Sequence, residues 1–597
     1  AAFDHRHVFV DPEPDPEASY GERRRLFELP RSSWADYASK LIPEGGGVCA
    51  RSLKSIALTP QMKALTGLDA EHTTPAELIR AMLLAEADLL WVGGIGTYVK
   101  ASDETNAEVG DRANDMLRVD GRELRFKAVG EGGNLGLTQR GRIEFARKGG
   151  RINTDAVDNS GGVDCSDHEV NIKILLNGVV ANGDLTMKQR NALLQEMEQD
   201  VGRLVLNTNY RQTETLSTTI ARSLEQLEAE ARFMHRLEHE GVLERPVEFL
   251  PDDEELGRRQ ANGEGLTRPE LAVLMAYAKN SLQRRLVRSE LPDDGWISRD
   301  LIDYFPPAMR ERFEKEIRDH QLRRDIIAMV VANEIINRAG ITFVTRVAEE
   351  SGAPVDQIAA SYLAAREVLG LQGVWDEIDA LDNVLPAHVQ TYMILEAKEV
   401  LHRMAIWFLT HLGLPLDIGS TVERFQGGMQ DLLASPALMQ AQTGERIAHQ
   451  TRYLTEKGVP DDLARRIASL APVSAGGDLV LLRERASAPV DEIARTYFAV
   501  GERSGLDWLR EAREMVSVHD HWDHLALGSI VEDLYDQQRA LAAMALEQGG
   551  LEAWQARHAK ALERAGELIT ELSTSGPLTV GKLGYVARQI RGVFAAI

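Results

Sequence analysis

Short apolar segments, three of them followed by loops that contain glycine, recur through the first 185 residues and restrict the possible fold classes. The pattern predicts strands at residues 3–10, 47–50, 88–92, 125–129 and 151–154, with helical stretches such as 74–87 between some of them. Short strands that alternate with helices usually pair in parallel and form a doubly wound sheet. Ligands of such sheets bind beyond the carboxyl ends of the strands.

Three loops place glycines at those expected strand ends. They read "WVGGIGTY", "GEGGN" and "DNSGGVDCS". Any one of them alone is most simply an ordinary turn between a strand and a helix. Their occurrence in consecutive units favours loops whose backbone approaches a ligand.

The last of these loops is expected to end where a helix begins, near residue 170. Gly161 and Gly162 would then leave bare amides at a helix N-terminus, which is a common anion site. Ser166 and Glu169 match the S-x-x-E spacing of a capping box. This spacing alone does not separate a capping hydroxyl from a hydroxyl that binds an anion.

From about residue 185 onward the glycine loops give way to helical periodicity. Thr267 and Glu270 have the spacing of a capping box, and Gly340 is placed to end a helix. Residues 353–371 and 488–506 are identical at eleven of nineteen positions, which predicts the same capped helix twice. We expect four regions: residues 1–185, a helical connection at 186–340, and two related helical subdomains at 341–480 and 481–597.

Composition excludes several classes of function. The 597 residues carry a net charge of -24 without basic clusters, which argues against nucleic acid and anionic membranes as partners. Only two cysteines are present, so a disulfide framework is excluded and a reducing cytoplasm is expected. No apolar run approaches the roughly 20 residues of a membrane span. The chain starts without Met in an apparent strand, which suggests a piece of a longer protein.

Three other features have ordinary alternatives. Asp4 stands where a dinucleotide fold places the acid that binds the ribose, although a surface or capping acid is the simpler interpretation. The stretch "VHDHWDH" at residues 518–524 is rich in metal-ligand types, but it precedes a helix, and we expect no metal there. Cys165 is expected to be a small buried thiol rather than a nucleophile.

The glycine loops also carry a resemblance to a known family. The sequence from "ADLLWVGGIGTYVKAS" through "FKAVGEGGNLGLTQRGRIEFARKGGRINTDAVDNSGGVDCSDHEVNIKILLN" resembles the dinucleotide-binding domain of glutamate dehydrogenases, above all the very long bacterial NAD-dependent class. Residues 1 to about 180 resemble the later part of that domain, and the remainder resembles the C-terminal extension of that class. The resemblance implies an α/β, Rossmann-type NAD-binding domain followed by a large all-α region.

The resemblance implies a role for particular residues. Those implied to bind the cofactor NAD are Asp4, Gly94, Gly96, Thr97, Glu131, Gly132, Gly133 and Asn134, with Asn134 at the nicotinamide amide. The family's N-A-G-G-V-x-x-S segment corresponds to "NSGGVDCS" here. Asn159 should therefore help to hold the amino acid, Val163 should pack on it, and Ser166 should bind its distal carboxylate. The family's catalytic Lys and Asp precede the matched segment, so no catalytic residue is expected in this chain.

The implied activity is the reversible NAD-dependent oxidative deamination of L-glutamate to 2-oxoglutarate and ammonia, in a cytoplasmic homo-oligomer. Two alternatives stay open. A dehydrogenase of apolar amino acids shares the N-x-G-G-V pattern, but it would be expected to carry an apolar residue at position 166. An assembly or regulatory module with vestigial cofactor loops would explain the large helical region.

Overall fold

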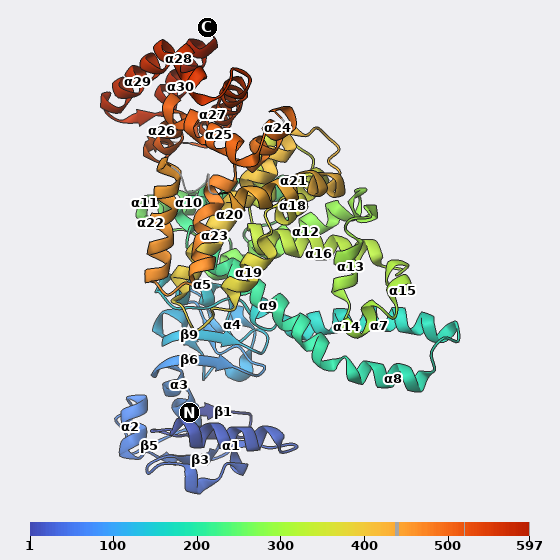
Figure 1. The fold of residues 1–597 in the computed structure, drawn as a ribbon. Helices are drawn as coiled ribbons and strands as arrows, with labels where there is room; N and C mark the ends of the chain where they lie inside the picture. The colour runs from blue at the N-terminus through green and yellow to red at the C-terminus, as the bar shows by residue number, and fades with distance from the viewer. Residues whose placement is uncertain (436–440, 487, 519, 596–597) are drawn as a thin grey trace. The chain divides into compact units, whose positions relative to one another are not determined.

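The computed structural model describes residues 1–435, 441–486, 488–518 and 520–595 (Figure 1). The chain divides into two compact units. Unit 1 comprises residues 1–227, 234–277 and 305–316, and unit 2 comprises residues 228–233, 278–304 and 317–597. Helices predominate in the described residues, and the strands belong to one three-stranded and four two-stranded sheets.

The first strands of unit 1 differ from those that the sequence predicts. Instead of one strand over residues 3–10, β1 (Ala2–Phe3) and β2 (His7–Val10) form an antiparallel hairpin, and β3 (Gly47–Ala50) adds antiparallel to β2. The bounds of β3 are as predicted, but parallel pairing is wrong for this sheet. Asp4 lies in the hairpin turn, where one carboxylate oxygen accepts the amides of Arg6 and His7 at 2.6 Å each.

Parallel pairing is confirmed further along the chain. β6 (Glu86–Val92) pairs in parallel with β9 (Arg125–Glu131), and an isolated parallel bridge joins Ala128 to Arg151. Helix α3 (Pro75–Leu83) lies in the segment 74–87 and begins with a capping box made by Thr74 and Glu77. The residues that the structure describes contain this parallel pair but no complete doubly wound sheet.

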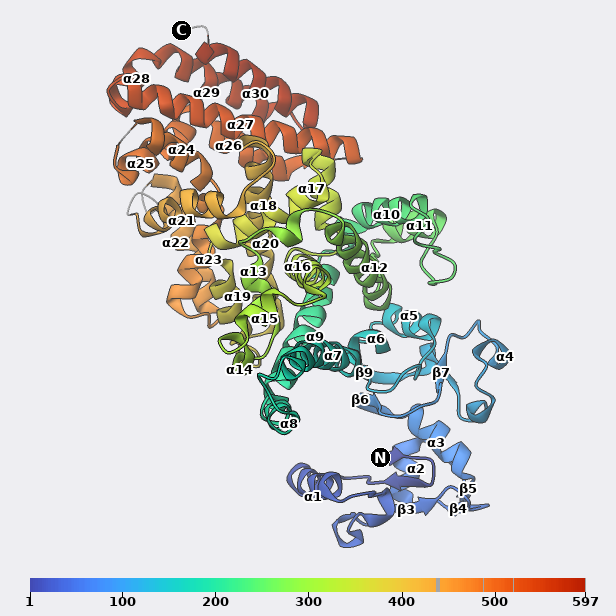
Figure 2. The ribbon, with the colours of Figure 1, turned by 90° about the vertical axis from the view of Figure 1, so that its right-hand side faces the viewer.

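The helices that follow β9 carry the last glycine loop. They are α5 (Gln139–Arg147), α6 (Asp155–Asp158), α7 (Ser160–Ala181), α8 (Met187–Glu196) and α9 (Glu198–Ile220). Helix α7 packs along α9, as both ribbon views show (Figure 2). The helix expected near residue 170 therefore begins ten residues earlier, and "SGGVDCS" lies inside α7.

The main helices of unit 2 confirm the periodicity of the sequence. Helix α16 (Arg323–Ala339) ends at Gly340, as predicted. The others used below are α18 (Val355–Val368), α20 (Ala387–His411), α22 (Ala441–Glu456), α23 (Asp461–Val473), α24 (Gly476–Ala486), α25 (Val490–Ser504), α26 (Leu506–Glu511) and α27 (His521–Glu547). At the start of α12 (Arg268–Val287), Glu270 forms its half of the predicted capping box, because its carboxylate accepts the amide and the hydroxyl of Thr267, both at 2.7 Å.

The two copies of the repeat form the same capped helix. Helix α18 follows Pro354 and is succeeded by Gly370, while α25 follows Pro489 and is succeeded by Gly505. Both glycines adopt a positive φ, of 62° and 74°, which is the left-handed conformation favoured at helix ends. The predicted duplication of this helix is confirmed, while the division into subdomains at residues 340 and 480 stays a prediction.

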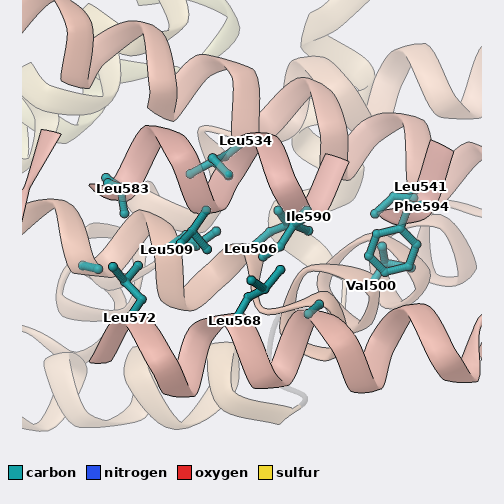
Figure 3. Packing of buried hydrophobic residues seen from close by; sticks show 14 of the residues in the cluster. Val500, Leu506, Leu509, Leu534, Leu541, Leu568, Leu572, Leu583, Ile590 and Phe594 are labelled. Atoms are coloured by element: carbon teal, nitrogen blue, oxygen red, sulfur yellow. The ribbon is translucent and has the colours of Figure 1, made fainter. Parts of the chain in front are cut away.

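The end of unit 2 has its own apolar core. Leucines 506, 509, 534, 541, 568, 572 and 583 gather there with Val500, Ile590 and Phe594 (Figure 3). They come from α25, α26, α27, α29 (Ala559–Thr574) and α30 (Val580–Ala595). The interior of this bundle is therefore mainly apolar, and the polar side chains of Ser504, Gln538 and His558 are buried in or next to the same helices.

Among the residues described, no single helix is both long and apolar enough to cross a membrane. Helix α16 passes that test of length and composition only together with α17 (Phe343–Ser351), and the two are bent by 87°.

Candidate functional site

Two of the predicted ligand segments meet in unit 1. The side-chain amide of Asn159 donates a hydrogen bond to the side-chain carbonyl of Asn134, at 2.8 Å. Asn134 belongs to the "EGGN" loop after β9, and Asn159 lies between α6 and α7. The structure therefore brings the loop expected at the nicotinamide next to the residue expected at the substrate.

The predicted substrate residues share one exposed face. Asn159, Val163 and Ser166 are separated by four and three residues, so they follow one another along one side of α7. Val163 is 76% exposed. The opposite side of the helix is buried through Ile172 and Leu175.

Ser166 does not lie at a helix start, and the predicted capping box is wrong. Its hydroxyl donates to the carbonyl of Gly162 one turn earlier, at 3.2 Å, while Glu169 pairs with Lys173. The bare amides belong instead to the first turn of α7, which contains Gly161 and Gly162. A Cβ at either glycine would make only ordinary contacts with this chain, so the chain itself does not require glycine there.

Helix α9 holds the start of α7 in place. The side-chain amide of Asn209 donates to the carbonyl of Val157 at 2.7 Å and to the hydroxyl of Ser160 at 2.8 Å. Arg268 reaches the same region, because its guanidinium donates to Asn153 at 2.9 Å and to Ser217 at 3.0 Å. These contacts fix the junction of α6 and α7, where Asn159 lies.

Glu131 is not available to a ligand. Its carboxylate is fully buried and accepts two hydrogen bonds from the guanidinium of Arg142, at 2.7 and 3.0 Å. It also accepts the amide of Leu137 at 3.1 Å, and Asp155 lies 3.1 Å from Arg142. Burial alone would lower the pKa of Arg142, but the carboxylates of Glu131 and Asp155 outweigh it and raise the pKa. Glu131 therefore supports the conformation of the "EGGN" loop through contacts within the protein.

Thr97 also makes its hydrogen bonds within the protein. Its hydroxyl donates to the carbonyl of Leu135 at 2.7 Å, and its amide donates to Asp111 at 2.9 Å. The bond to Leu135 ties the loop after β6 to the loop after β9. The neighbouring Gly96 has a φ of 134°, and a Cβ there would come within 2.8 Å of Asn114 and Tyr98.

The two loops touch at a pair of glycines. A Cβ on Gly133 would lie 2.7 Å from the carbonyl oxygen of Gly94, so the contact excludes any side chain at position 133. Around it, Trp91, Ile95 and Leu135 are 60%, 94% and 64% exposed. These exposed apolar side chains, next to the contact between the two loops, form a surface that suits a flat, partly apolar ligand.

The other candidates resolve differently. Burial opposes the charge of Asp4, but the amides of Arg6 and His7 outweigh burial and lower its pKa, so the carboxylate serves its own turn. Its role at the ribose stays a prediction. Cys165 is exposed, so the prediction of a buried thiol is wrong.

Within the described part of the chain, no group of three His, Cys, Asp or Glu side chains could hold a metal ion. In "VHDHWDH", Asp520 caps α27 by accepting the amide of Asp523 at 2.9 Å, and His519 lies outside the described residues.

Sequence reasoning missed the residues that support the site. Arg142, Asp155 and Asn209 were not among the predicted site residues, and no motif marks them in the sequence. A weak signal was present for one of them, because Asp155 and Asp158 stand three residues apart directly before Asn159. Asp158 accepts the amide of Glu131 at 3.0 Å and so joins α6 to the "EGGN" loop.

Comparison with known proteins identifies the family. Residues 1–219 match the family "Bacterial NAD-glutamate dehydrogenase, catalytic domain", and residues 263–592 match "Glutamate dehydrogenase, C-terminal". The chain belongs to the bacterial NAD-glutamate dehydrogenase family.

Relatives with the name NAD-specific glutamate dehydrogenase align with almost the whole chain. The relative from Pseudomonas aeruginosa is 46% identical over 99% of the chain, and that from Mycobacterium tuberculosis is 41% identical over 99%. The relative from Halomonas elongata is 43% identical over 96%. The chain spans 37% of the length of the first two relatives and 36% of the third.

Proposed function

We propose that the chain takes part in the reversible NAD-dependent oxidative deamination of L-glutamate to 2-oxoglutarate and ammonia. The observation that carries the proposal is the 2.8 Å hydrogen bond between Asn159 and Asn134. It joins a loop expected at the nicotinamide to a helix expected at the substrate. The names of the three relatives support the same reaction and the same cofactor.

The loops after β6 and β9 fit one edge of NAD. Gly94, Gly96, Gly132 and Gly133 would let the backbone approach the cofactor, and the amide of Asn134 would hold the nicotinamide carboxamide. The exposed side chains of Ile95 and Leu135 would cover its flat ring. When bound, NAD would supply the acceptor for the hydride that leaves the α-carbon of glutamate.

Glutamate would lie along the exposed face of α7. The free amides of the first turn carry the positive end of the helix dipole and would attract a carboxylate. Val163 would pack on the methylene groups, and the hydroxyl of Ser166 would exchange its long bond to Gly162 for a charge-assisted bond to the distal carboxylate.

The chemical steps of this reaction require from the described residues only that they hold the substrate and the cofactor in position. The α-carbon loses a hydride and the amine loses a proton, which gives an imine that water converts to 2-oxoglutarate and ammonia. The residues of α7 and the "EGGN" loop would hold the reacting atoms in line. By the family resemblance, a Lys and an Asp outside the matched segment would move the protons.

Ser166→Ala tests the substrate assignment in a protein extended to the length of the relatives. We expect kcat/KM for glutamate to fall by the equivalent of about 1.5 to 3 kcal/mol, the value of a hydrogen bond to a charged group. The loss should be much smaller for norvaline, which lacks the distal carboxylate. NADH absorbance measures both rates, and Cys165→Ala on the same helix is the control. Equal losses for both substrates would contradict the role of Ser166.

The isolated chain provides a second test. We expect it to show no glutamate turnover, and rapid turnover would mean that its own residues move the protons. The doubly wound arrangement of β6 and β9, a homo-oligomeric state and a cytoplasmic location belong to the proposal as further expectations.

A further inference from the structure

A cavity of about 180 Å³ lies inside unit 2, far along the chain from the glycine loops. Its walls come from α20, α22, α23, α25, α26 and α27, and their lining includes Arg403, Tyr497, Arg510 and Tyr535. This volume is well above the roughly 10 to 15 Å³ that a single water molecule needs. Its volume is therefore suited to a small metabolite.

Two guanidinium groups meet on one aromatic ring in this cavity. The central carbon of the Arg403 guanidinium lies 3.3 Å from the centre of the Tyr535 ring, and that of Arg510 lies 4.3 Å from it. Like charges held so close repel each other, and their positions are stabilised when an anion binds both. The ring of Tyr535 offers only the weaker attraction of its π face.

The charges of these two arginines are incompletely matched by the chain. Arg510 pairs with Asp507, but its second terminal nitrogen, Nη1, is buried without a hydrogen-bond acceptor among the described residues. Arg403 donates to Ser474 at 2.7 Å and to the hydroxyl of Tyr535. No carboxylate in the described part of the chain lies within the 4.0 Å ion-pair distance of Arg403. A buried donor without an acceptor is unfavourable and points to a missing partner.

Most acidic side chains of the cavity are already paired. Glu511 pairs with Arg446 at 2.7 Å, and Glu399 lies 3.6 Å from Arg513. The nearby Glu532 attracts Arg403, but burial dominates and raises the pKa of its carboxyl group. Among the described residues, Arg510 has Asp507 as its partner, whereas Arg403 has hydrogen bonds only to hydroxyl groups.

The lining also contains acidic side chains. Glu396 lies two helical turns before Arg403 on α20, and Glu514 lies on the exposed segment after α26. An inorganic anion would be too small to contact the arginines and these carboxylates together. A carbon chain with a carboxylate at one end fits the volume, the two arginines and the apolar wall of Val400, Val531 and Phe498.

We propose that this cavity is a binding site for a small carboxylate, whose carboxylate group is held by the guanidinium groups of Arg403 and Arg510. The planar donors of arginine match the two oxygens of a carboxylate. Ser474 positions Arg403 for this contact.

The test is calorimetric titration of the 597-residue chain with succinate, γ-aminobutyrate and inorganic phosphate. We expect saturable binding of at least one of the two carboxylates, and weaker binding of phosphate. γ-Aminobutyrate is similar in length to succinate and carries an ammonium group that could pair with the acidic lining residues. Comparison of the two affinities reports whether those residues contribute. The proposal is overturned if neither carboxylate binds, or if phosphate binds as tightly as the better of them.

Variants locate the site. Arg403→Met should weaken carboxylate binding at least tenfold, and Arg403→Lys, which keeps the charge but loses the planar fork, should weaken it less. Arg424→Met is the control, because Arg424 also lies over an aromatic ring but, unlike Arg403, pairs with a glutamate and lies outside the cavity. Circular dichroism melting checks that each variant is folded. Unchanged binding in folded Arg403→Lys and Arg403→Met proteins, or an equal loss in Arg424→Met, would overturn the assignment.

Discussion

The two copies of the repeated helix keep the same tyrosine but neutralise its acidic partner in different ways. In α18, the hydroxyl of Tyr362 lies 3.3 Å from the carboxylate of Glu334. In α25, the hydroxyl of Tyr497 donates to Asp478 at 2.9 Å. Both tyrosines are almost completely buried. Both copies therefore have a buried tyrosine hydroxyl next to a carboxylate, but the groups that surround this pair differ.

The difference lies in the source of the positive charge. In the first copy, Arg366 of the repeat helix itself lies 3.6 Å from Glu334 and 3.5 Å from Asp300. The second copy has Gly501 at the equivalent position, and Arg539 of α27 donates to Asp478 instead, at 2.5 Å. Because the second copy takes its cation from another helix, one side of α25 is free to line the cavity with Tyr497 and Phe498.

Loss of Arg366 should have the largest effect. Burial alone would lower its pKa, but Glu334 and Asp300 outweigh burial and raise the pKa, so the guanidinium is the counter-charge of both acids. Arg366→Met should lower the free energy of unfolding by about 3 to 5 kcal/mol, because it leaves buried charges unpaired. Denaturant titration measures this value. The exposed Arg424→Met should lose no more than about 1 kcal/mol, and an equal loss in both variants would contradict the comparison.

The second largest effect on stability is expected from removal of the tyrosine hydroxyl groups, and it should differ between the two copies. Tyr497 bonds a carboxylate at 2.9 Å, so Tyr497→Phe should reduce the stability by about 1.5 to 3 kcal/mol. Tyr362 makes a longer contact, so Tyr362→Phe should reduce it by only about 0.5 to 1.5 kcal/mol. Thermal denaturation of the two variants side by side provides the measurement. The reverse order would show that the shorter bond is not the stronger one here.

Gly501 tests whether the second copy tolerates a side chain. A Cβ at this position would lie 2.5 Å from Nε2 of Gln538 and 2.6 Å from Oδ1 of Asp507. Both atoms belong to side chains that can move, and alanine favours the helix, so Gly501→Ala should cost only about 1 kcal/mol. Ala364→Gly on the first copy is the comparison for helix propensity, with the loss of one buried methyl group added to it. A stabilised Gly501→Ala protein would mean that the neighbouring side chains yield freely.

The smallest effect on stability is expected at His411, and it should depend on pH. Burial lowers the pKa of His411, but its bond of 2.8 Å to Asp536 and its contact with the carbonyl of Trp407 outweigh burial and raise the pKa above 6.5. The charged pair therefore contributes its full stability below pH 6.5 and loses it as the pH rises through the folded pKa. His411→Gln should be less stable than the parent by less than about 1 kcal/mol at pH 6. Melting temperatures from pH 6 to 9 should converge, and a constant difference would contradict this.

Local patterns predicted much of the fold because their causes are local. The capping box at Thr267, the helix end at Gly340 and the two copies of the repeat follow from residues next to them in sequence. The start of α7 was misjudged because Gly161 and Gly162 suggest a turn, whereas the bonds from Asn209 on α9 hold a helix there. No local pattern shows that contact.

The candidate site was predicted in part for the same reason. Asn134 and Asn159 were identified from their loops, and the structure places them in contact. Glu131 and Thr97 were assigned to the cofactor, but their partners Arg142 and Leu135 become visible only when the chain is folded. The cavity of unit 2 joins residues more than a hundred positions apart, so neither motif nor periodicity predicts it.

The contact between Gly94 and Gly133 has a consequence for the evolution of this chain. A Cβ at position 133 would strike the carbonyl oxygen of Gly94, so a mutation to alanine there is blocked for as long as the backbone at position 94 keeps its place. Lineages that acquire alanine at position 133 must first, or at the same time, alter the course of the other loop. The two loops should therefore diverge together, and ancestral reconstructions should show their changes on the same branches.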